Sequence, residues 1–304
     1  MMSIRTLGER CYANAYLLLC IASLFFAANA IAGRMAAGLV TPVTLTFFRW
    51  SIATTVIIFL ARKHLRRDIG VLARHWLLVF ALGALGFAGF NLFLYGALNY
   101  TTAINVSIEQ SAIPVTVMLI NFIAFRQRIR TLQCLGVLAT IAGVVVTVSH
   151  GDPWSIIAKG VNRGDAIMIG AVLTYAGYAV ALRFKPAVHG LSLMAGMAAS
   201  SWLFTLPVFS YQVFEQGFVV PGAVGWAIIV YAALLPAIVS QLFFMRSIDL
   251  IGSNRAAVFM NLVPIFGAVM AVVVLGESFQ TFHLLGLILV LGGLAVAERF
   301  AKSA

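Results

Sequence analysis

The chain has 304 residues, of which 62% are hydrophobic and only 10% are charged, with a formal net charge of +11. Soluble domains carry about 25% charged residues, so this composition excludes an ordinary soluble protein and predicts an integral membrane protein. Nucleic-acid binding would need a basic face on a soluble fold, and nucleic acid is therefore not an expected partner.

Ten apolar segments follow one another along the chain, each long enough to cross a bilayer as a helix, which takes about 20 residues. The first, 13–33, exceeds the roughly 7–15 residues of a signal-peptide core, so we expect it to be retained. The predicted fold is all-α with ten transmembrane helices. The other nine spans are expected at 42–61, 76–98, 102–125, 131–149, 165–184, 190–210, 223–246, 252–275 and 281–300.

The basic residues predict the orientation, because Lys and Arg accumulate in cytoplasmic loops. With the N-terminus inside, sixteen fall on the inner side and three on the outer side, while Arg49 lies within the second span. Both termini are therefore expected in the cytoplasm. The sixteen are Arg5, Arg10, Arg62, Lys63, Arg66, Arg67, Arg74, Arg126, Arg128, Arg130, Arg183, Lys185, Arg246, Arg255, Arg299 and Lys302, and the three are Arg34, Lys159 and Arg163.

The two halves of the chain carry an internal duplication. Residues 1–149 are expected to form the first five-helix repeat, 150–164 an extracytoplasmic connecting loop, and 165–304 the second repeat. Five helices per repeat is an odd number, so the repeats must be inverted relative to each other, as in many transporters. A shift of 149 or 150 positions pairs Pro114 with Pro264, Thr131 with Thr281, Gly136 with Gly286, Gly143 with Gly293, Asn91 with Gln241, Asn29 with Tyr178, and Arg34 with Arg183.

The stretch 102–125 carries a carboxylate and a proline inside an apolar span. A charged group within a span should face protein or water rather than lipid. Glu109 has two interpretations, which are a substrate-binding or proton-carrying residue and a structural ion pair with Arg49. Pro114 is expected to bend the helix, and it forms a predicted hinge set with Pro236 and Pro264.

Polar side chains recur on the helices that would surround a central path. An amide in hydrocarbon must either bond across helices or face a watery cavity, and its recurrence on several helices favours a cavity. Amides together with tyrosines suit small amphipathic solutes. The predicted substrate-binding residues are Asn29, Asn91, Tyr95, Glu109, Tyr175, Tyr178, Gln241 and Asn261.

Enzyme chemistry finds no support in the motifs. The sequence has no glycine-rich phosphate loop, no HExxH motif and no recognisable nucleophile–base pair. Cys11, Cys20 and Cys134 have no metal-ligand spacing, so neither a disulfide framework nor a metal site is expected. We therefore predict a protein that is not an enzyme and that binds no cofactor.

Several residues stand out by their order and spacing: Asn29, Arg34, Pro42 and Arg49 in the first half, and Pro264, Glu277, Gly286 and the Gly292-Gly293 pair in the second. This arrangement resembles the drug/metabolite transporter superfamily, EamA type, along essentially the whole chain. The resemblance implies ten helices in two inverted sets of five with both termini cytoplasmic. One position departs from the family, which often has Glu at the end of the fourth helix of both repeats. This chain has Glu277 in the second and Arg126 at the matching place in the first.

Within the superfamily the chain is most similar to amino-acid exporters, including aromatic amino acid exporters. We predict a multi-pass secondary transporter of the inner (cell) membrane that exports small amphipathic metabolites, foremost neutral or aromatic amino acids, by alternating access. The alternatives are a multidrug, nucleoside or sugar-type transporter and, outside the superfamily, a non-transporting scaffold or a lipid-modifying enzyme. The expected partners are the substrate and the bilayer, without an ATP-binding subunit, in a monomer or homodimer.

Overall fold

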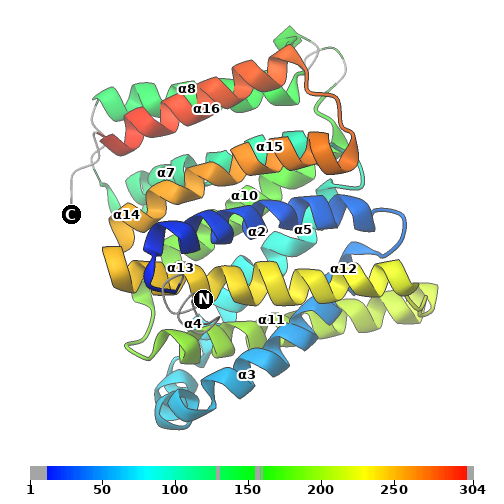
Figure 1. The fold of residues 1–304 in the computed structure, drawn as a ribbon, viewed down its shortest axis with the longest axis vertical. Coiled ribbons are helices and arrows are strands. Elements are labelled where there is room, and N and C mark those ends of the chain that lie inside the picture. The colour runs from blue at the N-terminus through cyan, green and yellow to red at the C-terminus, as the bar shows by residue number, and fades with distance from the viewer. Residues whose placement is uncertain (1–11, 128–130, 155–157, 159, 300–304) are drawn as a thin grey trace, which may run out of the picture.

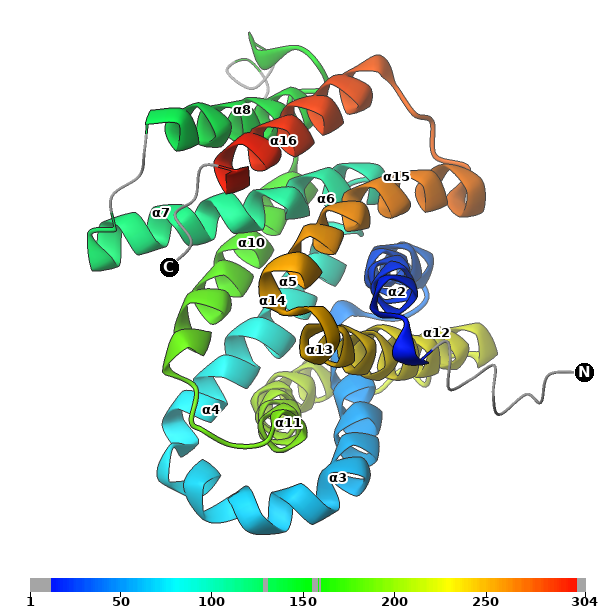
Figure 2. The same ribbon diagram turned by 60° about the vertical axis from the view of Figure 1, so that its left-hand side comes forward.

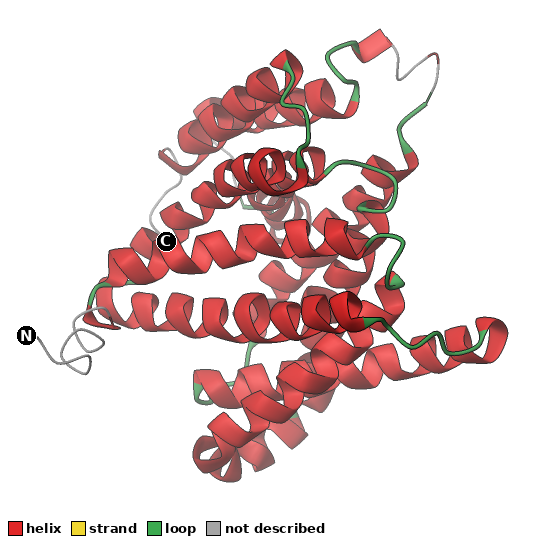
Figure 3. Ribbon diagram, turned by 45° about the vertical axis from the view of Figure 1, so that its right-hand side comes forward, coloured by secondary structure: helices red, strands yellow, loops and turns green. Residues whose placement is uncertain are grey.

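A computed structural model describes residues 12–127, 131–154, 158 and 160–299. Over these ranges the chain is helical and contains no strand (Figure 3). Ten of its helical segments are long and apolar enough to cross a membrane, which confirms the predicted all-α membrane fold. Six of the basic residues used for orientation lie outside the described ranges: Arg5, Arg10, Arg128, Arg130, Lys159 and Lys302.

The spans form two successive sets of five. The first set is α2 (Ala15–Ala36), α3 (Pro42–Arg74), α4–η1–α5 (Trp76–Leu82, Gly83–Gly89, Phe90–Ala97), α6–η2–α7 (Ala103–Glu109, Gln110–Ala112, Ile113–Phe125) and α8 (Thr131–Val148). The second set is α10 with η3 (Arg163–Ala181, Leu182–Phe184), α11 (Gly190–Gln216), α12–η4–α13 (Ala223–Leu234, Leu235–Val239, Ser240–Ile251), α14–η5–α15 (Ser253–Val258, Phe259–Asn261, Leu262–Leu275) and α16 (Thr281–Arg299).

Local sequence explains where several of these helices begin. Asn14, Thr41, Thr102 and Asn162 precede α2, α3, α6 and α10, and each side chain accepts a hydrogen bond from a backbone N–H of the first turn. Such caps satisfy amide groups that have no partner within the helix. Pro42 occupies the first turn of α3, where its missing N–H costs nothing.

Interruptions occur at corresponding places in the two sets. The third span of each set contains a π-helical segment, η1 or η4, and the fourth contains a 3-10 turn, η2 or η5. Pro114 and Pro264 follow the two 3-10 turns, and Pro236 lies in η4. Each predicted hinge proline therefore lies in or beside an interruption of its span, and its role as a hinge stays a prediction.

Packing interleaves the two sets. The first helix of each set packs against the third and fourth spans of the other set: α2 against α13 and α15, and α10 against α5 and α7. The second helices, α3 and α11, pair at one end of the molecule, and the fifth helices, α8 and α16, pair at the other (Figures 1 and 2). Each helix of one set thus packs against helices of the other set, and the interface between the two sets runs through the centre of the molecule.

The second span is longer than the sequence predicts. The apolar run ends at 61, but α3 continues to Arg74, because residues 62–74 contain no proline and the end of an apolar run is not the end of a helix. The added turns are fastened to the segment before α11, where the backbone N–H of His189 donates to Asp68 at 3.0 Å. The rings of His64 and His189 stack with their centroids 3.7 Å apart.

The C-terminal ends of α7 and α15 show that Arg126 is not the first-repeat equivalent of Glu277, as the sequence alignment of the two repeats suggested. Arg126 ends α7 with φ 54° and Gly276 ends α15 with φ 68°, so these two residues occupy equivalent left-handed positions. The next residues, Gln127 and Glu277, each donate their backbone N–H to the carbonyl six residues earlier. The first-repeat equivalent of Glu277 is therefore Gln127, because the cap geometry fixes the alignment.

The contact between α8 and α16 depends on glycine. A Cβ atom built on Gly293 would lie 2.6 Å from the carbonyl oxygen of Gly136 and from Oγ1 of Thr140, whereas one built on the neighbouring Gly292 meets nothing within 4 Å. Small residues of this kind let membrane helices approach closely.

Gly293→Ala should therefore lower the melting temperature in detergent, with a loss of roughly 1–3 kcal/mol from overpacking. Gly292→Ala is the matched control, since it makes the same gain in helix propensity without the clash. Thermal unfolding of the two variants side by side tests the interface. Equal melting temperatures would contradict it.

Candidate functional site

A cavity of about 390 Å³ lies between the two sets of helices. Its walls combine aromatic rings with amide, guanidinium and carboxylate groups, and all three predicted hinge prolines border it. The lining residues are Phe26, Asn29, Arg49, Trp50, Gly86, Phe87, Phe90, Asn91, Gln110, Ser111, Ile113, Pro114, Tyr175, Pro236, Ala237, Gln241, Phe244, Ala257, Met260, Asn261, Val263, Pro264, Leu294 and Glu298.

Arg49 holds one end of this cavity. Its guanidinium donates to Asn29 Oδ1 and to Asn91 Oδ1, both at 2.7 Å, and to the Tyr95 hydroxyl. The Tyr95 hydroxyl in turn donates to Asn29 Oδ1 at 2.7 Å. This Arg49 network is buried, since Arg49 is only 4% exposed. The Nε–H of Arg49 has no acceptor among the described residues, so one charged donor is left unused.

One of the two interpretations of Glu109, an ion pair with Arg49, does not appear among the contacts of the described residues. The guanidinium is satisfied by neutral oxygens from α2 and α5. Glu109, at the end of α6, instead lies within hydrogen-bonding reach of Asp165 at the start of α10. The sequence could not decide whether Glu109 lies beside Arg49 or beside Asp165, because it does not show which face of α6 packs against α3 and which against α10.

Aromatic rings form one continuous wall. Trp50 stacks on Phe87 with centroids 4.6 Å apart, and Phe90 lies 4.9 Å from Tyr175. Tyr178 stands behind them, 5.2 Å from Tyr175. The wall comes from α3, η1, α5 and α10, and it joins both sets of helices.

The eight predicted binding residues divide into two groups by their position. Five of them, Asn29, Asn91, Tyr175, Gln241 and Asn261, line the cavity. Of the other three, Tyr95 lies behind the lining in the Arg49 network, Tyr178 backs the aromatic wall, and Glu109 faces Asp165. Among the described residues, Gln241 makes no hydrogen bond, whereas Asn261 donates to Glu298 at 3.5 Å.

The lining is buried at one end and exposed at the other. Asn29 and Arg49 lie about two helical turns from the ends of α2 and α3 that face each other, which we call the loop face. At the opposite end Ala257 and Glu298 are exposed. The described structure is therefore closed toward the loop face.

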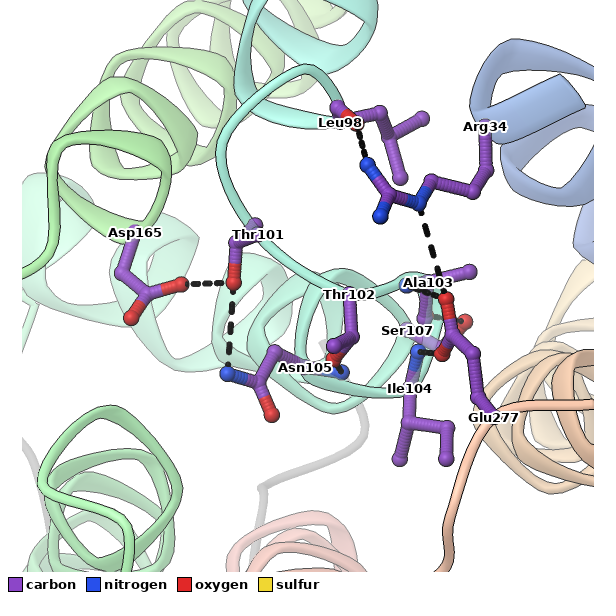
Figure 4. A network of polar contacts seen from close by, with 10 residues as sticks. All are labelled: Arg34, Leu98, Thr101, Thr102, Ala103, Ile104, Asn105, Ser107, Asp165 and Glu277. Carbon is purple, nitrogen blue, oxygen red and sulfur yellow. Dashed lines mark hydrogen bonds and ion pairs between the residues drawn. The ribbon is translucent and has the colours of Figure 1, made fainter. Parts of the chain in front are cut away.

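Figure 4 shows a second layer of contacts. It lies nearer the loop face than the Arg49 network, because Arg34 is closer to the end of α2 than Asn29 is. Arg34 donates to the Leu98 carbonyl at 2.7 Å, and its Nε lies 3.8 Å from Glu277 Oε1. Glu277 also accepts from the backbone N–H groups of Ala103 and Ile104 at 2.9 and 3.0 Å. These bonds connect α2, the start of α6 and the segment before α16, so both sets contribute to the closure.

Two roles were missed by reading the sequence. Arg49 lines the cavity itself, and Glu298 lines its exposed end. Arg49 was recognisable in the sequence as the cation placed within a span. It was interpreted as the partner of Glu109, so it was not included among the predicted binding residues. Glu298 stood near a chain terminus, where a carboxylate is unremarkable in sequence.

Ten spanning helices in two matching sets, arranged around a central cavity, define a membrane transporter fold. The family model of the EamA-like transporter family matches residues 13–149 and again residues 162–298. The chain therefore belongs to the EamA-like transporter family. It is an integral, multi-pass membrane protein.

Two relatives and one solved structure are similar to this chain along most of its length. The uncharacterized transporter YyaM of Bacillus subtilis is 23% identical over 94% of this chain and 93% of its own. An uncharacterized transporter of Archaeoglobus fulgidus is 27% identical over 92% of this chain and 96% of its own. A protein of known crystal structure has a TM-score of 0.64 at 20% identity, covering 95% of this chain and 97% of that one, and so shares the fold.

The Arg49 network generates a stability prediction. Tyr95→Phe removes a hydroxyl that both accepts from Arg49 and donates to Asn29, leaving a buried donor with one partner fewer. We expect a loss of roughly 1–3 kcal/mol, seen as a lower melting temperature in detergent. The matched control is Tyr178→Phe, because that hydroxyl makes no hydrogen bond within the described residues. If both variants melt alike, the network adds no stability.

Proposed function

We propose that the protein is a secondary transporter for small amphipathic solutes that carry a carboxylate, foremost neutral and aromatic amino acids. The observation that carries this proposal is the Arg49 guanidinium, which hydrogen-bonds only to neutral oxygens and lines a cavity walled by aromatic rings. A guanidinium whose positive charge meets only neutral partners suits a carboxylate, since charge-assisted hydrogen bonds are the strong ones. A volume of about 390 Å³ falls within the roughly 300–1,000 Å³ of small-molecule sites.

The rest of the lining fits a zwitterion with an apolar side chain. Gln241 offers an unengaged amide, which suits either charged group of a zwitterion. Glu298 lies at the exposed end of the lining, away from Arg49, where its carboxylate would attract the ammonium group of an entering solute. The aromatic wall of Trp50, Phe87, Phe90 and Tyr175 would take the side chain by stacking. Arg49 and the aromatic wall therefore supply partners for the carboxylate and for the apolar side chain of an amino acid.

The closed loop face supports a direction. If both termini are cytoplasmic, as the basic residues predict, the exposed end of the cavity faces the cytoplasm and substrate loads from there, as an exporter requires. The proposed location is the inner (cell) membrane. Labelling of single cysteines introduced at Glu298 and at Leu39 with a membrane-impermeant reagent tests this orientation. Reaction of position 298 from outside intact cells would contradict it.

Flux in liposomes containing only this protein tests the function. Preloaded vesicles are given radiolabelled neutral, aromatic, acidic and basic amino acids, with a nucleoside, a sugar and a cationic drug as competitors. Exchange of neutral or aromatic amino acids supports the proposal. Exchange of only the nucleoside, sugar or drug assigns another substrate class, and no flux of any solute would favour a scaffold or an enzyme.

Gln241 provides the sharpest cavity variant because it holds no other residue in place. Gln241→Leu should raise the KM for amino-acid exchange by about ten-fold, which corresponds to one lost hydrogen bond of roughly 1.4 kcal/mol, at an unchanged melting temperature. Gln216→Leu, an exposed position at the end of α11, is the control. An unaltered KM for Gln241→Leu would show that the amide does not contact the substrate.

A further inference from the structure

We propose that Glu109 and Asp165 form a proton-binding site, in which two carboxyl groups share one proton and link transport to a pH difference. This inference deepens the proposed function and rests on it for the coupling, but not for proton binding. Neither residue lines the cavity, so the site is separate from the one that would bind the solute. It joins α6 of the first set to α10 of the second.

Both carboxyl groups are buried, and most of their oxygens receive no hydrogen bond from the described residues. Glu109 is 3% exposed and Asp165 is 0% exposed. Thr101 donates its hydroxyl to Oδ1 of Asp165, as Figure 4 shows. Asp165 Oδ2 and both carboxyl oxygens of Glu109 have no donor among the described residues. Two ionised carboxylates in contact there would repel each other, whereas one shared proton supplies the missing donor.

The helix ends indicate which carboxyl carries the proton. Asp165 lies in the first turn of α10, where the positive end of the helix dipole stabilises an anion, and it already accepts from Thr101. Glu109 gains no such stabilisation, because α6 continues in helical form through η2 into α7 and neither carboxyl oxygen of Glu109 accepts a hydrogen bond among the described residues. The neutral partner is therefore Glu109, which donates to an ionised Asp165.

Charged and titratable groups around the pair do not replace the proton. Arg34 on α2 is taken up by Glu277 and the Leu98 carbonyl. Arg163 on α10 lies over the Tyr100 ring, 4.5 Å from its centroid. Tyr95 on α5 belongs to the Arg49 network. Within their described ranges α7 and α15 contain no ionisable side chain.

Two histidines stand on the loop-face side of the pair. His283 on α16 is joined to it through Asn105, whose Oδ1 lies 3.1 Å from the His283 Nε2 and whose Nδ2 donates to Thr101 at 3.3 Å. His150 follows α8, and its charge would act on Asp165. His150 is exposed and gives the pair a titratable neighbour at the loop face.

The proton-binding site is linked to the cavity by the residues that follow Glu109 in the sequence. Gln110 and Ser111 immediately follow Glu109, belong to the 3-10 turn η2 and line the cavity. Release of the proton would leave two negative charges at the junction of α6 and α10, and separating them would move η2. Occupancy by a proton and by a solute can therefore be coupled through this turn. A metal ion is a poorer fit, because the described residues contain no group of three His, Cys, Asp or Glu side chains able to bind one.

The first test needs no substrate. Infrared spectra of purified protein at neutral pH should contain a protonated-carboxyl band that is lost in Glu109→Gln and kept in Glu215→Gln, a change at an exposed carboxylate on α11. Glu109→Gln should melt close to the wild type, since its amide donates to Asp165 as the proton did. A retained band, or a large fall in melting temperature, would overturn the proposal.

The second test uses liposomes and the amino acid with the highest exchange rate. One proton per solute and a pH difference of one unit support up to about ten-fold accumulation. Glu109→Gln should lose accumulation but keep exchange, and Glu215→Gln should keep both. Accumulation driven by Na⁺ instead of pH, or unchanged in Glu109→Gln, would overturn the coupling. If the wild type moves no amino acid while the infrared result holds, the proposed substrate fails and the proton site stands.

Discussion

A guanidinium held inside the membrane by neutral oxygens is the constraint on which the centre of this protein depends. Burying a charge is costly unless hydrogen bonds compensate it, and Arg49 obtains them from Asn29, Asn91 and Tyr95. Those bonds fasten α2, α3 and α5 at one level and close the cavity toward the loop face. Among the described residues no carboxylate neutralises the guanidinium, which is why the proposed substrate is one that carries a carboxylate.

The helical scaffold is duplicated, whereas the charged residues at its centre occur in only one of the two repeats. The two family matches are offset by 149 residues, and the helix breaks η2 and η5 obey the same offset. At this offset Arg49 corresponds to Ala198, Glu109 to Val258 and Asp165 to Tyr16. The charged groups at the centre are therefore asymmetric additions to a symmetric scaffold. In the proposed transport cycle, alternation between two similar states depends on the scaffold, whereas selectivity and coupling depend on these additions.

The interruptions in the helices also contribute residues to the cavity of the proposed function. Irregular backbone at membrane depth is tolerated where it is buried in protein or lines a cavity. Here η2 and η5 contribute Gln110 and Asn261 to the cavity, and Pro236 of η4 borders it as well. The same segments contain the least regular backbone of their spans. The proposed function therefore assigns solute contact and helix rearrangement to the same segments.

The sequence by itself determined the medium, the ten spans and the duplication, because hydropathy and repeat spacing are properties of single segments. It also identified five residues that line the cavity, since an amide in hydrocarbon must find a polar surrounding. Only the tertiary structure decided the partners of the charges. Whether Glu109 meets Arg49 or Asp165 depends on how α6 is rotated against α3 and α10, and packing of the whole bundle sets that rotation.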